Sequence, residues 1–249
     1  MAFSDPFELN YSKVRAYLSC PHLYKYIYLE RRYPPHTPFS ALGISVHRAL
    51  ARYHAAGETP KERGLSDLML YYDESWHHQG FETPQQTLEF YGLGRRILED
   101  YCRAGQGGAR AKTVFTEKDF DFPFEKWRVR GTMDRVDRAL PGEGYEIIDY
   151  KMGFENRTRE DLEKDLQLAI YAIGLKKNFN MDVSAVSWMM LVQGEKISVP
   201  YDPAREGPVL DLLRETGERM IALDLSHKGR CPSCSIRTFC QEYEDKAKG

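Results

Sequence analysis

Two strand-like segments with acidic side chains constrain the fold of this chain more than any other feature. The first reads RGTMDRVD from Arg130 to Asp137, and the second reads YEIIDYK from Tyr145 to Lys151. Ile147 and Ile148 are consecutive apolar residues, which is typical of a strand that is buried on both faces. Charged groups that end such a strand must be paired, hydrated in a cleft or bound to a metal.

The acidic and basic side chains of these segments are expected to converge. Residues two apart on a strand share a face, so Asp149 and Lys151 should point the same way. Asp134 lies on the preceding strand of the predicted hairpin, within reach of that face. Two carboxylates at one point suit Mg²⁺ or Mn²⁺, and a lysine beside them can orient an attacking water. Taken alone, however, Asp-x-Lys is more often a solvated surface pair.

Hydrophobic periodicity predicts an α/β fold. Helices are expected over about 12–32, 40–56, 60–76, 83–105, 158–177 and 208–223, with Ser12, Thr83 and Thr158 as N-caps. Strands are expected over 113–122, 127–139, 145–151, 183–192 and 195–201. The order is helices, a three-strand meander, a helix, a hairpin and a final helix.

Length and composition favour a single domain. The chain has 249 residues, of which 42% are hydrophobic and 12% aromatic, enough for a sizeable core. We expect one domain over 1–249, with a mainly helical part (1–110), an α/β core (111–205) and a helix with a Cys-rich tail (206–249).

The net charge leaves nucleic-acid binding open, whereas hydropathy argues against a segment that spans a membrane. The net charge of −2 does not indicate a nucleic-acid binder, but acidic metal ligands can offset local basic clusters in the total. No stretch approaches the roughly 18 apolar residues that cross a bilayer. The N-terminal segment lacks the pattern of a signal peptide, so a cytoplasmic protein without membrane association is expected.

The cysteines predict a metal site. Three of the five lie in a C-x2-C-x5-C tail formed by Cys231, Cys234 and Cys240, and Cys20 lies far upstream. In a cytoplasmic protein this pattern indicates metal rather than disulfides. Four thiolates suit zinc or an iron–sulfur cluster, and spacing alone does not separate the two. Cys102 is left over and is expected to be a buried helix thiol.

Several motifs in one order resemble the RecB-like branch of the PD-(D/E)XK nuclease superfamily. They are Tyr11-Ser12 with Cys20-Pro21-His22, the G-x-x-x-H of Gly43–His47, the G-x-x-D-R-V-D of Gly131–Asp137, the I-I-D-Y-K of Ile147–Lys151, and the Q-x-x-x-Y of Gln167–Tyr171. The resemblance covers nearly the whole chain. It implies a restriction-endonuclease-like core with a central mixed sheet flanked by helices.

The resemblance also implies roles for single residues at a metal site. His47, Asp134 and Asp149 would be metal ligands for Mg²⁺ or Mn²⁺, with the backbone carbonyl of Tyr150 as an additional ligand. Lys151 would be the catalytic lysine.

On the helix that follows, Gln167 and Tyr171 would contact DNA or brace that lysine. Two carboxylates are left outside this assignment. Asp137 is a rival to Asp134, and Glu117 is expected to have a structural or indirect role. Met152 departs from the family, which usually has Ser or Thr after the lysine.

The Cys pattern resembles that of iron–sulfur nucleases of the AddB type and of CRISPR-associated RecB-like exonucleases. This implies a 4Fe-4S cluster on Cys20, Cys231, Cys234 and Cys240, with zinc as the alternative. It also implies an exonuclease that acts on single-stranded DNA or DNA ends in repair, recombination or CRISPR adaptation, with a helicase or a CRISPR adaptation protein as partner. The chain has no Walker A sequence of its own. The alternative is a non-catalytic DNA-binding adaptor that retains the fold and the cluster.

Overall fold

The computed structural model describes residues 7–55, 63–105, 112–139, 142–153, 156–226, 231, 234–237 and 240. Within these residues no helix is both long and apolar enough to span a bilayer. The chain divides into two compact units. Unit 1 contains Met1–Pro35, Pro123–Arg130 and Ala204–Gly249, and unit 2 contains His36–Phe122 and Gly131–Pro203. The single domain expected over 1–249 stays a prediction.

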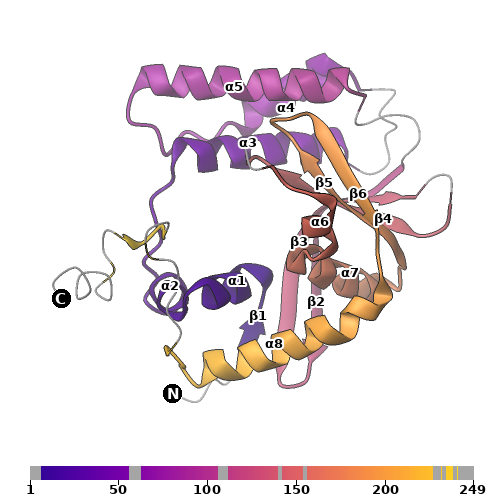
Figure 1. The fold of residues 1–249 in the computed structure, drawn as a ribbon. Helices are drawn as coiled ribbons and strands as arrows, with labels where there is room; N and C mark the ends of the chain where they lie inside the picture. Colours follow the sequence, from indigo (N-terminus) through magenta and orange to yellow (C-terminus); the bar gives the residue numbers. More distant parts are fainter. Residues whose placement is uncertain are drawn as a thin grey trace. The chain divides into compact units, whose positions relative to one another are not determined.

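A mixed β-sheet confirms the expected fold class (Figure 1). Its strands are β1 (Phe7–Leu9), β2 (Lys112–Phe124), β3 (Trp127–Arg138), β4 (Tyr145–Lys151), β5 (Val183–Met190) and β6 (Glu195–Pro200). The order is β1-β3-β4-β5-β6, and β2 also pairs with β3. β4 runs antiparallel to β3 and parallel to β5, and β5 runs antiparallel to β6. Within β4, Ile147 and Ile148 are 0% and 3% exposed, as expected for a strand that is buried on both faces.

In unit 2 the helices form two groups. They are α3 (Pro38–Tyr53), α4 (Leu65–Ser75) and α5 (Pro84–Arg103) in one group, and α6 (Arg159–Glu163) and α7 (Leu166–Phe179) in the other. Figure 1 shows α3, α4 and α5 packed on one another. Ile148 and Tyr150 of β4 belong to the core of this first group, whereas Lys151 contacts α7. Since successive strand residues point to opposite faces, the two groups cover opposite faces of β4.

Unit 1 contains the remaining elements. They are β1, α1 (Tyr11–Ser19), α2 (Pro21–Tyr24), a π-helical turn (Lys25–Leu29), and α8 (Glu206–Ile221), which follows a 3-10 turn (Pro203–Arg205). β1 lies parallel to the first residues of β3, with Leu9 opposite Val129. Helix α8 approaches this pair closely, because a Cβ at Gly217 would lie 3.1 Å from the Trp127 ring.

The single helix expected over 12–32 is wrong. The chain leaves helical geometry at Cys20, whose φ and ψ are −167° and 122°. Pro21 explains the break, because a proline disfavours the helical conformation of the residue before it and is well placed to start a new helix. The N-cap is Asn10 rather than Ser12, since the Asn10 side chain accepts the Lys13 N–H at 2.9 Å.

The helix expected over 158–177 is two helices. Thr158 caps α6 as predicted, but Asp165 interrupts the run and caps α7, accepting the Leu168 N–H at 2.7 Å. Asp165 thereby fixes the first turn of α7, where Gln167 lies. Thr83 caps α5 as predicted, and α3 begins earlier than expected, at Pro38, with Thr37 as its N-cap. The predicted end of that helix at residue 56 lies outside the described residues.

Candidate functional site

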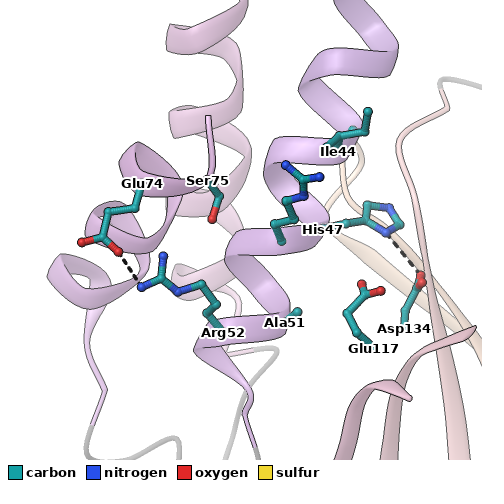
Figure 2. A pocket seen from close by; sticks show the side chains of 10 residues that line it. Ile44, His47, Ala51, Arg52, Glu74, Ser75, Glu117 and Asp134 are labelled. Carbon is teal, nitrogen blue, oxygen red and sulfur yellow. Dashed lines mark ion pairs between the residues drawn. The ribbon is translucent and has the colours of Figure 1, made fainter. Parts of the chain in front are cut away.

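A histidine and two carboxylates converge in unit 2. His47 comes from α3, Glu117 from β2 and Asp134 from β3, and one possible ligand atom of each lies within 4.8 Å of the others (Figure 2). Within this group, His47 Nδ1 lies 3.5 Å from Asp134 Oδ2. Carboxylate oxygens with one imidazole nitrogen form a donor set that suits Mg²⁺ or Mn²⁺. The residues present therefore fit a divalent cation.

Glu117 enters this cluster although the sequence assigned it no direct role. Its φ is +45°, a left-handed value that is uncommon for a residue other than glycine. A left-handed residue inside a strand interrupts the alternation of side chains and redirects its own. No residue type near Glu117 in the sequence predicts this left-handed conformation.

Asp149 and Lys151 share a face of β4, as predicted. Lys151 Nζ lies 2.5 Å from Asp149 Oδ2 and donates to Gln167 Oε1 at 2.9 Å. Gln167 Nε2 in turn donates to the Tyr171 hydroxyl at 2.9 Å. The lysine is therefore held between its own strand and α7. Of the two roles expected for Gln167 and Tyr171, the contacts within the chain match bracing of the lysine.

A backbone hydrogen bond from the other strand of the hairpin holds Asp134. The Tyr150 backbone N–H donates to Asp134 Oδ2 at 2.9 Å, so the carboxylate of β3 is fixed against β4. Burial opposes ionisation of Asp134, but its contacts with His47, this N–H and Lys151 outweigh burial and lower its pKa. Asp134 is thus an anion at neutral pH.

The other groups of the site respond to the negative charge of Asp134. Burial and then the Asp134 charge raise the pKa of Asp149 to about 7. Burial and Asp134 also raise the pKa of Glu117. Burial lowers the pKa of His47. The hydrogen bond to Asp134 and the charges of the surrounding carboxylates raise it by more, so the pKa of His47 lies above its usual value. Like charges in one buried site repel, and a bound cation would relieve that repulsion.

Asp137, the rival to Asp134, is engaged elsewhere. It is 0% exposed and forms a two-pronged ion pair with Arg135, with Nε to Oδ1 at 2.7 Å and Nη2 to Oδ2 at 2.5 Å. Arg135 also donates through Nη1 to the Tyr101 hydroxyl at 3.0 Å and contacts His54 Nε2 at 3.1 Å. The geometry thus brings Asp134, and not Asp137, to the candidate metal site with His47 and Glu117.

A pocket of about 790 Å³ opens beside the cluster. It runs along α3 to the end of α4, and Figure 2 shows the side chains that line it. His47, Glu117 and Asp134 form one part of its wall, and an ion pair between Arg52 and Glu74 at 2.5 Å forms another.

The four cysteines of the expected cluster all lie in unit 1. Burial raises the pKa of the Cys234 thiol, and Cys20, Cys240 and Cys231 raise it further as charged neighbours. Cys234 packs in the same small apolar cluster as Cys240, and all four cysteines are free thiols. Cys102 lies apart, half-buried in α5, with its sulfur 3.8 Å from the Tyr53 hydroxyl.

Comparisons with known proteins identify the family of this chain and a similar fold. The family model for the PD-(D/E)XK nuclease superfamily matches residues 8–241. A crystal structure of a protein from Eubacterium rectale described as a putative exonuclease is similar in fold, with a TM-score of 0.54 at 10% identity over 94% of this chain and 87% of that chain. A crystal structure of SSO0001 gives a TM-score of 0.45 at 14% identity over 97% and 89% of the two chains. No curated protein sequence matches.

The match to the superfamily extends over far more than half of the chain. It includes both strands of the hairpin that carries Asp134 and the Asp149-Tyr150-Lys151 sequence. This chain therefore belongs to the PD-(D/E)XK nuclease superfamily.

Proposed function

We propose that this chain is a divalent-metal-dependent deoxyribonuclease that acts as an exonuclease on single-stranded DNA or DNA ends. The observation that carries the proposal is the convergence of His47, Glu117 and Asp134 within 4.8 Å, next to the Asp149–Lys151 pair. In metal-dependent hydrolysis of a phosphodiester, a bound cation activates the water and a nearby positive group stabilises the charge that develops on the phosphate.

Each residue of the site has a role in this proposal. His47, Asp134 and Asp149 would hold Mg²⁺ or Mn²⁺, with Glu117 as a further donor and the Tyr150 carbonyl as an additional ligand. The bound metal would supply Lewis-acid stabilisation of the phosphate and acidify a water.

The bracing residues act on the lysine. Lys151 would orient the attacking water and offset negative charge that develops on the phosphate. Gln167 holds the lysine amine at 2.9 Å, and Tyr171 holds Gln167, so the amine does not have to be ordered when substrate binds.

We further propose a 4Fe-4S cluster on Cys20, Cys231, Cys234 and Cys240. The packing of Cys234 beside Cys240 and the electrostatic influence of Cys20, Cys231 and Cys240 on the Cys234 thiol support a shared metal site, and the family resemblance favours iron–sulfur over zinc. When bound, the cluster would tie the N-terminal helices to the C-terminal tail, so its role would be structural. Action in repair, recombination or CRISPR adaptation, beside a helicase or a CRISPR adaptation protein, rests on the same resemblance.

The test is degradation of end-labelled single- and double-stranded DNA by anaerobically purified protein with Mg²⁺, Mn²⁺ or EDTA. We expect metal-dependent cleavage, and we expect Lys151→Ala to reduce its rate by about 10²–10³, the usual effect of removing one charge-stabilising group. The exposed Lys164→Ala variant, which removes the same charge from α6's end, should cleave normally.

The result that would contradict the proposal is absence of cleavage with every metal from folded, iron-loaded protein. That outcome would favour the alternative function, a DNA-binding adaptor that retains the fold without the chemistry.

A further inference from the structure

The pocket beside His47, Glu117 and Asp134 is much larger than a metal ion requires. Its volume is about 790 Å³, whereas a water molecule takes up about 30 Å³ of liquid. A cation with its waters would occupy only the part that His47, Glu117 and Asp134 line. The rest, along α3 toward Glu74, has room for a ligand that extends from the metal.

One face of α3 forms a wall of this pocket. Ile44, His47, Arg48 and Ala51 line it, and their spacing of three and four residues places them on one side of a helix. Arg48 is therefore the next residue along the chain from the histidine at the metal cluster, and it faces the same space. Its side chain is exposed, as a residue that meets a ligand from solvent must be.

The pocket is lined by two arginines whose surroundings differ. Arg52 is already engaged, because it pairs with Glu74 at 2.5 Å and lies over the Tyr71 ring at 4.6 Å. Within the described part of the chain, the Arg48 side chain forms no ion pair and no hydrogen bond. The positive charge of Arg48 acts on Glu117, which belongs to the candidate metal site with His47 and Asp134.

These charges bear on how the site could accept a polyanion. The carboxylates of the cluster repel phosphates, and the chain as a whole has a net charge of −2. Binding of a strand therefore needs local positive charge beyond the metal. A guanidinium provides it with a planar fork that matches two phosphate oxygens.

We infer that Arg48 binds a backbone phosphate of the nucleic-acid strand next to the phosphate at the metal cluster, and that the pocket along α3 is the track for that strand. Arg52 shapes the pocket but does not bind phosphate. The inference rests on the proposed function for its substrate class, a single strand with a phosphodiester backbone.

The experiment compares Arg48→Gln with Arg52→Gln in the whole 249-residue chain, purified anaerobically. Binding of a fluorescein-labelled single-stranded oligonucleotide is measured by anisotropy with Ca²⁺, at salt concentrations between about 50 and 200 mM, the range over which phosphate contacts have large effects. Cleavage of the same oligonucleotide is measured with Mn²⁺. Arg52→Gln is the matched control, since it removes the same charge one helical turn away.

We expect Arg48→Gln to raise the Kd and the KM about tenfold, with kcat changed less than about threefold, because a contact to an unreacting phosphate contributes uniform binding. The plot of log Kobs against log salt should become shallower by about 0.7, the value for one phosphate of a single strand. Arg48→Lys should keep the salt slope and lose less affinity. Arg52→Gln should keep the wild-type slope.

An unchanged Kd and salt slope in Arg48→Gln, or an equal loss in Arg52→Gln, would overturn the inference. The failure of the proposed function is a separate result. If the wild-type protein binds the strand with the Arg48-dependent slope but never cleaves it, the subsite stands and the nuclease proposal fails. If the wild-type protein does not bind the strand at all, both fail.

Discussion

At the scale of single residues, Glu117 combines an unfavourable backbone conformation with a place in the candidate metal site. A left-handed φ at a residue other than glycine costs on the order of 1–3 kcal/mol and persists where the surroundings enforce it. Here the conformation brings the Glu117 carboxylate to His47 and Asp134. Such a cost is understandable if the carboxylate binds a cation.

We therefore expect Glu117→Gln to weaken binding of Mn²⁺ at least tenfold, a magnitude that even less direct partners of metal sites can reach. The measurement is the rise of Tm with added Mn²⁺. This rise reports how far Mn²⁺ binds the folded protein, and it needs no DNA. Asp119→Asn, which neutralises a carboxylate two residues along β2 that accepts a bond from Thr132, is the control. An equal response to Mn²⁺ in wild type and Glu117→Gln would remove Glu117 from the site.

At the scale of elements, two glycines of α5 test how closely the helices of unit 2 pack. A Cβ at Gly94 would collide with the Tyr72 hydroxyl and lie 2.7 Å from Leu42, whereas a Cβ at Gly92 would meet only the end of Arg96 at 3.6 Å. We expect Gly94→Ala to destabilise the protein by about 1–3 kcal/mol through overpacking. Gly92→Ala should be neutral or stabilising by up to about 1 kcal/mol, because alanine favours helix. Urea unfolding of both variants decides, and equal stabilities would contradict the packing.

The buried network behind the hairpin connects α3, α5 and β3. His54 Nε2 lies 2.7 Å from the Tyr101 hydroxyl and 3.1 Å from Arg135 Nη1. Since arginine can only donate, His54 Nε2 accepts, and the ring is neutral. Burial and then the positive charge of Arg135 hold the pKa of His54 well below its usual value.

This depressed pKa makes stability depend on pH in a defined direction. The unfolded chain binds a proton at His54 below about pH 6.5, and the folded chain does not, so the contribution to stability is present above that pH and lost as pH falls. We expect wild type to lose up to about 1.4 kcal/mol per pH unit more than His54→Gln below pH 6.5. Urea titrations of both proteins at several pH values measure this difference. Parallel pH profiles would show that His54 takes up a proton in the folded state.

At the scale of the whole chain, the proposed cluster joins segments that are far apart in sequence. Cys20 stands between α1 and α2, and its partners lie beyond residue 230. Closing so long a loop restricts the unfolded chain strongly. Loss of one ligand should therefore affect stability more than the chemistry of the separate site in unit 2.

We expect Cys234→Ser to lose iron and the absorbance near 400 nm and to lower Tm, while Cys102→Ser keeps both. Elemental analysis and visible spectra of anaerobically purified proteins measure this. Full iron content and stability in Cys234→Ser would rule out the cluster as a staple. A colourless wild-type protein with bound zinc would support the alternative metal.

Much of this fold could be predicted because its signals are local. The alternation in 127–138 and 145–151 gave the hairpin to within a residue, and the apolar pair Ile147-Ile148 indicated burial on both faces. Caps at Thr83 and Thr158 are also local. The breaks at Cys20 and Asp165 were missed, because the apolar periodicity continues across them and hides the effect of a following proline or of an internal cap.

The residues of the candidate site likewise divide into those that local sequence predicts and those that it does not. By itself the sequence determined that Asp149 and Lys151 share a face, and that Gln167 and Tyr171 are one helical turn apart, because both follow from the geometry of a strand or a helix. Only the tertiary structure decided that Asp137 pairs with Arg135 in the core, that Glu117 joins His47 and Asp134, and that Arg48 faces the pocket while Arg52 is paired. Those facts depend on contacts between elements distant in sequence, and no local periodicity encodes which side chains meet there.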